Sequence, residues 1–265
     1  MDATYTHGHE ESVLRSHRWR TAENSAGYLL PHLREDLSLL DVGAGPGTIT
    51  GDLAGRVASA TATEVDEDTL ALTRQGVEAA VRPGTARVEY VVADVHALPM
   101  QAASFDVVHA HQVLQHVADP VQGLREMRRV ARPGGLVAVR DSDYPAFAWY
   151  PRVPGLDEWL ELYLTLARGN GGEPAAGRRL LSWARTAGFE EVTATSSTWC
   201  FSTPEDRAWW GGMWADRVRH TKLARQAIAT GAATASDLDR IAAAWRSWAA
   251  ADDGWFSVLH GEILA

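Results

Sequence analysis

The sequence predicts an α/β protein built on one open, mostly parallel sheet with helices on both faces. Short apolar runs typical of strands alternate with helical patterns through residues 37–143. Successive right-handed crossovers of this kind place helices on both faces of a sheet. The chain has 265 residues, 46% of them hydrophobic, and a single cysteine, Cys200. It can therefore bury a sizeable core without disulfides.

The elements of the first half can be assigned in chain order. One or two helices over residues 11–33 precede the sheet. Strands are predicted at residues 37–42, 59–65, 88–93, 105–110 and 136–140, with helices at 48–57, 66–80 and 120–131. Residues 132–135 read Arg-Pro-Gly-Gly and predict a turn, because proline cannot continue a helix and glycine permits a tight bend.

The second half is less regular and completes the sheet. Helices are predicted at residues 155–168 and 177–187. The strand-like runs 192–201 and 255–264 should form an antiparallel pair, which makes seven strands in all.

Charge and composition indicate which kinds of molecule the protein is not expected to bind. A net charge of −9 disfavours nucleic-acid binding, and no stretch of about twenty residues is apolar enough to span a membrane. The single cysteine is typical of a reducing compartment, so a cytoplasmic location is expected. Small-molecule chemistry is the best interpretation, with a monomer or homodimer as the active species.

A glycine-rich turn follows the first strand, as Gly43-Ala44-Gly45-Pro46-Gly47. Alternate glycines let the backbone turn tightly and let a ligand approach without intervening side chains. The dinucleotide fingerprint needs a further glycine where Thr48 stands, which disfavours NAD and FAD.

Two acidic residues at strand ends indicate what the turn binds. Glu64 ends the second strand, where a carboxylate can accept both hydrogens of a ribose diol. Asp94 ends the third strand, where it can accept from an adenine amine. Each acid alone could be a solvated strand end or a helix cap, but the combination predicts an adenosine site.

These motifs, in this order, resemble the class I S-adenosylmethionine-dependent methyltransferases, in the branch that includes the ubiquinone and menaquinone biosynthesis C-methyltransferases. The resemblance covers residues 38–140 and rests on the segments 39–47, 64–66, 93–99, 105–108, 114–120 and 132–135. It implies a Rossmann-like class I methyltransferase fold. It also implies S-adenosyl-L-methionine as the cofactor and S-adenosyl-L-homocysteine as the product.

The resemblance further implies a single domain and a set of cofactor contacts. Residues 1–36 would form an N-terminal helical cap and 37–143 the cofactor-binding core, while the helical insertions 144–176 and 204–253 would form a lid over the acceptor site. The implied cofactor-binding residues are Asp41, Gly43, Ala44, Gly45, Gly47, Glu64, Val65, Asp94, Val95, His111 and Gln112. Among them, His111 and Gln112 would flank the amino acid and the sulfonium.

Candidate catalytic groups follow the fourth and fifth strands, because ligands of such sheets bind beyond the carboxyl ends of the strands. They are His111, Asp143 and Tyr144, with Asp141 as a further candidate. A sulfonium methyl is already activated, so its transfer needs alignment, exclusion of water and sometimes a base. No metal is expected, because His109 would point into the sheet if residues 105–110 form a strand, so that His109, His111 and His116 need not converge.

Ten of the eleven tryptophans lie from Trp149 onward. They could simply pack the insertions onto the sheet. Alternatively, some of them form a pocket for a flat apolar acceptor. The candidate acceptor-binding residues are Tyr5, His9, Tyr144, Phe147, Trp210 and Trp214.

The stretches 5–9 and 18–26 are similar to bacterial enzymes of secondary metabolism, including methyltransferases that act on an indole carbon of tryptophan-derived cyclic dipeptides. Together with the aromatic second half of the chain, this resemblance predicts a hydrophobic, aromatic small molecule as the acceptor, with an indole carbon of such a dipeptide as the specific candidate. The alternative interpretation is a cofactor-binding relative that does not transfer methyl.

Overall fold

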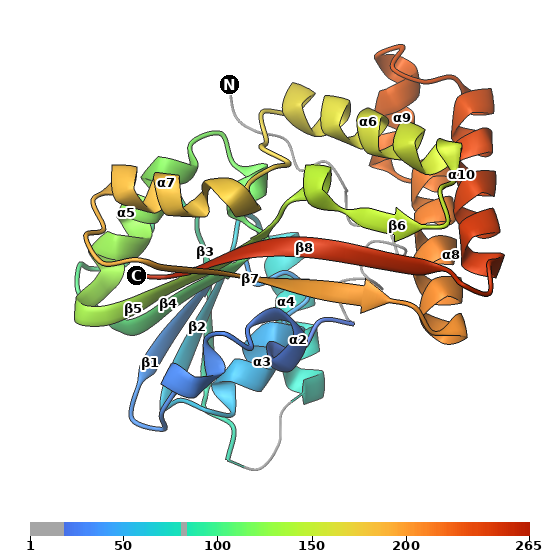
Figure 1. The fold of residues 1–265 in the computed structure, drawn as a ribbon. Coiled ribbons are helices and arrows are strands. Elements are labelled where there is room, and N and C mark those ends of the chain that lie inside the picture. The colour runs from blue at the N-terminus through green and yellow to red at the C-terminus, as the bar shows by residue number, and fades with distance from the viewer. Residues whose placement is uncertain (1–18, 81–83) are drawn as a thin grey trace.

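The computed structural model describes residues 19–80 and 84–265, and it confirms the predicted α/β class (Figure 1). One sheet has the strand order β3-β2-β1-β4-β5-β8-β6, with β7 paired to β8. The strands are β1 (Ser38–Val42), β2 (Ser59–Glu64), β3 (Val88–Val92), β4 (Phe105–His111), β5 (Ala131–Ser142), β6 (Ala148–Tyr150), β7 (Thr193–Phe201) and β8 (Trp255–Leu264). Strands β1 to β5 are parallel, and β8 runs antiparallel to β5, β6 and β7.

Helices cover both faces of this sheet, and a further group gathers at one end of it beside β6 (Figure 1). The α-helices are α2 (Ala22–Ser25), α3 (Thr48–Ala54), α4 (Glu67–Ala80), α5 (Pro120–Val130), α6 (Pro154–Gly169), α7 (Leu180–Ala187), α8 (Pro204–His220), α9 (Lys222–Ala229) and α10 (Ala235–Ala250). Single 3₁₀ turns are η1 (Leu30–His32), η2 (Leu114–His116), η3 (Tyr144–Ala146) and η4 (Gly177–Arg179). Of the helices described, none combines the length and the apolar character needed to cross a membrane.

The strand count and the start of the fifth strand differ most from the prediction. The part of the chain that the structure describes forms eight strands, because the three-residue strand β6 adds to the seven expected. The segment 132–135, predicted as a turn, lies within β5. There Ala131 pairs with Phe105 before the register shifts, and Gly134 absorbs the irregularity with a φ of 77°.

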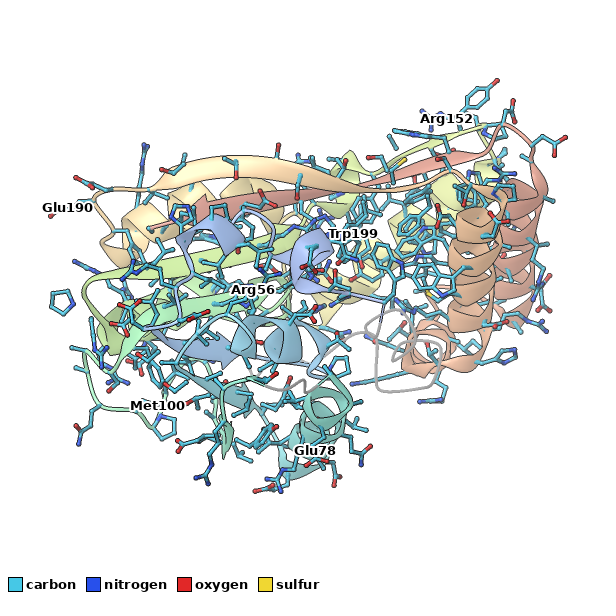
Figure 2. All side chains as sticks on the ribbon, turned by 90° about the horizontal axis from the view of Figure 1, so that it is seen from below. Arg56, Glu78, Met100, Arg152, Glu190 and Trp199 are labelled. Carbon is cyan, nitrogen blue, oxygen red and sulfur yellow. The ribbon has the colours of Figure 1, made fainter. Side chains whose placement is uncertain are left out.

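The core has three parts, and its aromatic part lies under the insertions. Leu39 and Val107 pack towards α2 and α3, while Leu40 and Val108 pack towards α5 and α7. The third part joins β7 and β8 to α6, α8 and α10 through aromatic side chains. Trp199, which is labelled in Figure 2, is a buried member of this aromatic part. The aromatic part therefore begins where the parallel strands end.

Candidate functional site

A cavity of about 470 Å³ lies beyond the carboxyl ends of β1, β2, β3 and β4. This volume is typical of a site for a small ligand or cofactor. The predicted cofactor residues that line it are Asp41, Gly43, Ala44, Gly45, Glu64, Val65, Asp94, Val95, His111 and Gln112. The cavity is also lined by residues that were not among the predicted cofactor contacts, including Arg20, Thr48, His96 and His116.

The turn after β1 contains three glycines, and glycine is needed at each position for a different physical reason. All three have a positive φ: 65° at Gly43, 58° at Gly45 and 79° at Gly47. A Cβ at Gly47 would lie 2.2 Å from the carbonyl oxygen of Thr73 in α4, so this glycine permits close packing and does not line the cavity. A Cβ at Gly45 would meet no atom of the described residues within 4 Å. The turn is therefore open to a ligand at Gly45.

Glu64, at the end of β2, is only 9% exposed and holds this turn. Its Oε1 accepts a hydrogen bond from the backbone N–H of Gly45 at 2.5 Å, and its Oε2 accepts from that of Val65 at 3.3 Å. Burial raises the pKa of Glu64 to about 7, against the effect of these two hydrogen bonds. The carboxylate is therefore positioned by the glycine turn at the edge of the cavity.

Asp94 and His96 form an exposed pair just after β3. The Oδ1 atom of Asp94 accepts from the backbone N–H of His96 at 2.8 Å and lies 2.7 Å from its Nδ1. Partial burial raises the pKa of Asp94, but the hydrogen bonds from His96 outweigh it and leave the pKa below its ordinary value. An ionised carboxylate thus lies at the rim, where a ligand amine could donate to it.

Asp41 lines the cavity, but protein groups already engage its carboxylate. Its Oδ1 lies 2.8 Å from Nδ1 of His109, and its Oδ2 accepts from the hydroxyl of Thr50 at 2.5 Å. His109 is therefore engaged by Asp41. Within residues 19–80 and 84–265, no three His, Cys, Asp or Glu side chains converge as a metal site requires.

His111, the last residue of β4, is a buried histidine on the cavity wall. Neither of its ring nitrogens has a hydrogen-bond partner among the residues described. Burial, together with the positive charges of Arg140 and Arg20, lowers its pKa well below the ordinary value. The imidazole is therefore neutral and can accept a hydrogen bond from a ligand.

The other two catalytic candidates lie away from this cavity. Asp143 holds η4 through a bidentate ion pair, with its two oxygens each 2.6 Å from nitrogens of Arg178. Tyr144 stacks on Tyr163 with ring centroids 3.9 Å apart. Asp141 is buried as well, and its Oδ1 accepts from the backbone N–H of Gln115 at 3.1 Å. Of these candidates, only His111 lies on the cavity wall.

The candidate acceptor residues of the second half are buried in the aromatic core. Trp210 stacks on Phe201 with centroids 4.2 Å apart, and Trp214 stacks on the indole of Trp245 at 5.9 Å. Phe147 packs in the same cluster. These contacts favour the packing interpretation for Trp210 and Trp214. Tyr5 and His9 lie outside the described residues.

A different set of rings connects the cavity wall to the aromatic core. His111 lies 5.8 Å from Trp199, measured between ring centroids, and Trp199 makes an edge contact with Trp19 at 5.3 Å. Trp19 in turn lies 5.4 Å from Trp209. Sequence reasoning did not select Trp19 or Trp199, because these rings come from segments about 180 residues apart in the chain.

Comparisons with known proteins agree with this geometry. A family model described as a methyltransferase domain matches residues 40–139. An uncharacterized methyltransferase of Schizosaccharomyces pombe is 33% identical over 98% of this chain and 95% of its own length. A demethylmenaquinone methyltransferase of Clavibacter sepedonicus is 30% identical over 68% of this chain and 75% of its own.

A solved structure supports the fold. A protein of Bacillus halodurans classed with the methyltransferases superposes with a TM-score of 0.55, covering 90% of this chain and 95% of its own. At 22% identity this likeness concerns the fold alone.

Proposed function

The chain belongs to the S-adenosylmethionine-dependent methyltransferases, and we propose that it methylates a hydrophobic, aromatic small molecule. Membership of this family confirms the fold, the reaction class and the cofactor that the resemblance implied. The acceptor is the part that we propose. The observation that carries it is the continuous series of rings His111, Trp199, Trp19 and Trp209, which leads from the cavity wall into the aromatic core.

The residues of the cavity fit the cofactor. Gly45 leaves room for a ligand to approach the backbone. The amino-acid part of the cofactor could therefore lie along this turn. Glu64 and Asp94 supply carboxylates at two separate strand ends, which suits a ribose diol and an adenine amine. We propose that these residues, with Val65, Val95 and the turn at Gly43, Ala44 and Gly45, bind the cofactor.

In the mechanism that we propose, the protein contributes mainly by aligning the acceptor with the cofactor and less by acid–base chemistry. When bound, S-adenosylmethionine supplies an activated methyl group on a sulfonium. The protein has to hold the acceptor in line with that group and keep water out, which in favourable cases lowers a barrier by roughly 7 to 11 kcal/mol. The neutral ring of His111 can accept a hydrogen bond from an N–H or O–H of the acceptor. His111 is thus the orienting group in this proposal.

An acceptor panel tests the proposal. The protein is incubated with S-adenosylmethionine and with indoles, a tryptophan-derived cyclic dipeptide, phenols, quinols and aliphatic amines, and methylated products are identified by mass spectrometry. We expect methylation of aromatic acceptors, and we propose an indole carbon of the cyclic dipeptide as the first to test. Methylation of aliphatic amines alone would exclude the aromatic class. Products from quinols or phenols without any from indoles would exclude the dipeptide.

A variant tests the role of the rings. Trp199→Leu should lower the turnover of the aromatic acceptor at least tenfold, because the ring beside His111 is lost. Trp183→Leu is the matched control, since Trp183 packs against the core cluster on the α5 and α7 side. Equal effects of the two substitutions would show that Trp199 acts only through folding stability.

A further inference from the structure

The backbone at the end of β4 adopts an unusual conformation. Gln112 has a φ of 55°, in the left-handed region that residues other than glycine rarely adopt. Its backbone N–H donates to the carbonyl of Arg140 at 2.7 Å, so the chain turns sharply directly after His111. A conformation of this kind is unfavourable for a residue with a side chain and persists only where its surroundings hold it.

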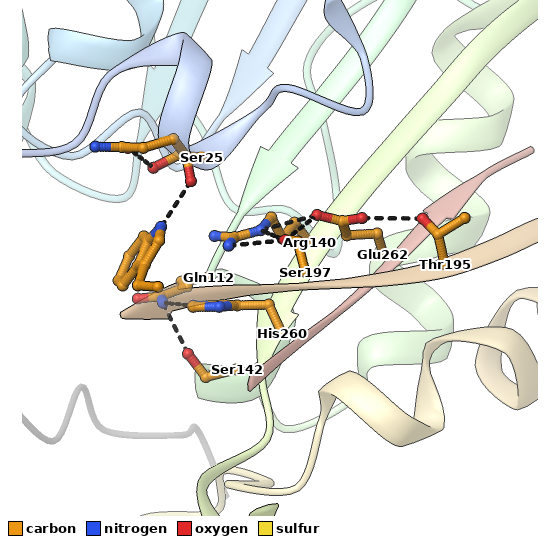
Figure 3. Close-up of polar contacts among 10 residues, drawn as sticks. Ser25, Gln112, Arg140, Ser142, Thr195, Ser197, His260 and Glu262 are labelled. Carbon is orange, nitrogen blue, oxygen red and sulfur yellow. Dashed lines mark hydrogen bonds and ion pairs between the residues drawn. The ribbon is translucent and has the colours of Figure 1, made fainter. Parts of the chain in front are cut away.

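The side chain of Gln112 is held by three separate segments. Its Oε1 accepts from Nη2 of Arg20 at 2.8 Å, in the segment before α2. Its Nε2 donates to the hydroxyl of Ser142, at the end of β5, at 2.7 Å. The same Nε2 lies 2.9 Å from Nε2 of His260 in β8, and Figure 3 shows Gln112, Ser142 and His260 in this arrangement. Protein partners therefore engage both polar atoms of the amide and both of its hydrogens.

The chemistry of the partners determines where the protons lie. Arginine has only donors, so the amide atom facing Arg20 must be the oxygen. The nitrogen then faces Ser142 and His260 and gives one hydrogen to each. Nε2 of His260 must consequently be an acceptor, which puts the proton of this ring on Nδ1.

The charges around His260 favour this neutral form. The ring is fully buried, and Arg140 from β5 and Arg20 from the N-terminal segment both face it. His111 from β4 lies 6.1 Å away between centroids, and Trp199 from β7 makes an edge contact at 4.4 Å. Glu262, further along β8, is engaged by Arg140 at 3.1 Å. Burial and the two guanidinium groups lower the pKa of His260 well below its ordinary value.

We propose that Gln112 is a positioning residue, which ties the end of β4 to Arg20, Ser142 and His260 and thereby fixes the cavity wall at His111. This inference rests on the proposed function, because it assigns Gln112 to the geometry of methyl transfer. It also changes the role implied by the resemblance, since an amide used by three protein partners has no hydrogen left for the cofactor. His260 becomes part of the same positioning device.

The protonation of His260 can be read directly from the imidazole ¹⁵N chemical shifts of the protein. At neutral pH we expect an uncharged ring with its proton on Nδ1 and with Nε2 unprotonated. In Gln112→Glu the carboxylate can only accept, so Nε2 of His260 should become protonated. A wild-type ring with its proton on Nε2 would overturn the proposal, and this measurement requires no variant to fold.

Binding of S-adenosylhomocysteine, measured by calorimetry, tests the positioning itself. Gln112→Leu should weaken this binding roughly tenfold, because the buried donors and acceptor around it are left unsatisfied. The control is Gln75→Leu on the exposed face of α4, with an expected change within about twofold. His260→Gln keeps an acceptor and should bind more tightly than His260→Leu.

The outcomes separate this inference from the proposed function. If the wild type binds S-adenosylhomocysteine and Gln112→Leu behaves like Gln75→Leu, then Gln112 has no positioning role, whatever the acceptor. If His260→Gln and His260→Leu lose equal affinity, the hydrogen bond to Gln112 is unimportant for binding. An acceptor panel without aromatic products would refute the proposed acceptor and leave both of these results unaffected.

Discussion

Glu64 illustrates how one residue can combine a structural and a binding role. Its position after β2 was enough to predict a carboxylate at the cavity. Its hydrogen bond to Gly45 could not be predicted, because it depends on how the turn after β1 folds back towards β2. We therefore expect substitutions of Glu64 to act on the cofactor site both directly and through the turn.

Replacing Glu64 by alanine should weaken S-adenosylhomocysteine binding by roughly 1.5 to 3 kcal/mol, the scale of a lost charge-assisted hydrogen bond. The measurement is a calorimetric titration of the wild type and the variant. Glu67→Ala, at an exposed position of α4, is the control. Unchanged affinity in Glu64→Ala would refute the ribose assignment.

The raised pKa of Glu64 predicts a pH dependence. Since burial raises it from 4.5 to about 7, the folded protein holds this proton more tightly than the unfolded chain. The contribution of Glu64 to the free energy of unfolding therefore falls as the pH rises from 4.5 to about 7.

The affinity for the cofactor should rise with pH, opposite to the contribution of Glu64 to stability. Ribose hydroxyls donate to the ionised carboxylate, so affinity for S-adenosylhomocysteine should rise up to tenfold per pH unit below about pH 7 and level off above it. Titrations between about pH 5.5 and 8.5 would measure this. The slope should disappear in Glu64→Gln, and a slope that persists there would assign it to another group.

At the scale of elements, the observed strands match the predicted ones best where the sequence pattern is strongest. β1 and β4 are continuous apolar runs, and their boundaries differ from the prediction by one residue at one end. β6 has only three residues at an edge of the sheet, too few to show an alternating pattern. The segment 132–135 carries a strong turn signal, and only its tertiary pairing with β4 makes it part of a strand.

The ion pair between Asp143, just before η3, and Arg178 in η4 should contribute to stability. The side chain of Asp143 is 2% exposed and that of Arg178 55% exposed. Arg178→Ala would leave a buried carboxylate without its main partner, so we expect the free energy of unfolding to fall by about 1 to 3 kcal/mol. Urea denaturation would measure this, with the exposed Arg185→Ala as the control.

The same variant also examines Asp143 as a catalytic candidate. If this carboxylate only anchors η4, Arg178→Ala and Asp143→Asn should bind S-adenosylhomocysteine like the wild type below their unfolding temperatures. A loss of turnover in Asp143→Asn with unchanged stability would instead restore Asp143 as a catalytic residue.

At the scale of the whole molecule, the site joins the two ends of the described chain. The turn at Gly45 and the acids Glu64 and Asp94 lie within one contiguous half, and their spacing carries a family pattern that sequence alone reveals. Arg20 and His260 lie 240 residues apart, and they meet at Gln112 only because β8 returns to β5. Long-range pairing of this kind leaves no local signal in the sequence.

We propose that the cavity at the carboxyl ends of the strands binds the adenosine of S-adenosylmethionine. Calorimetric titration of the wild type with S-adenosylhomocysteine, beside NAD on the same preparation, tests it most directly. We expect micromolar binding of S-adenosylhomocysteine at one site per chain and no measurable heat with NAD. Binding of NAD with none of S-adenosylhomocysteine would contradict it.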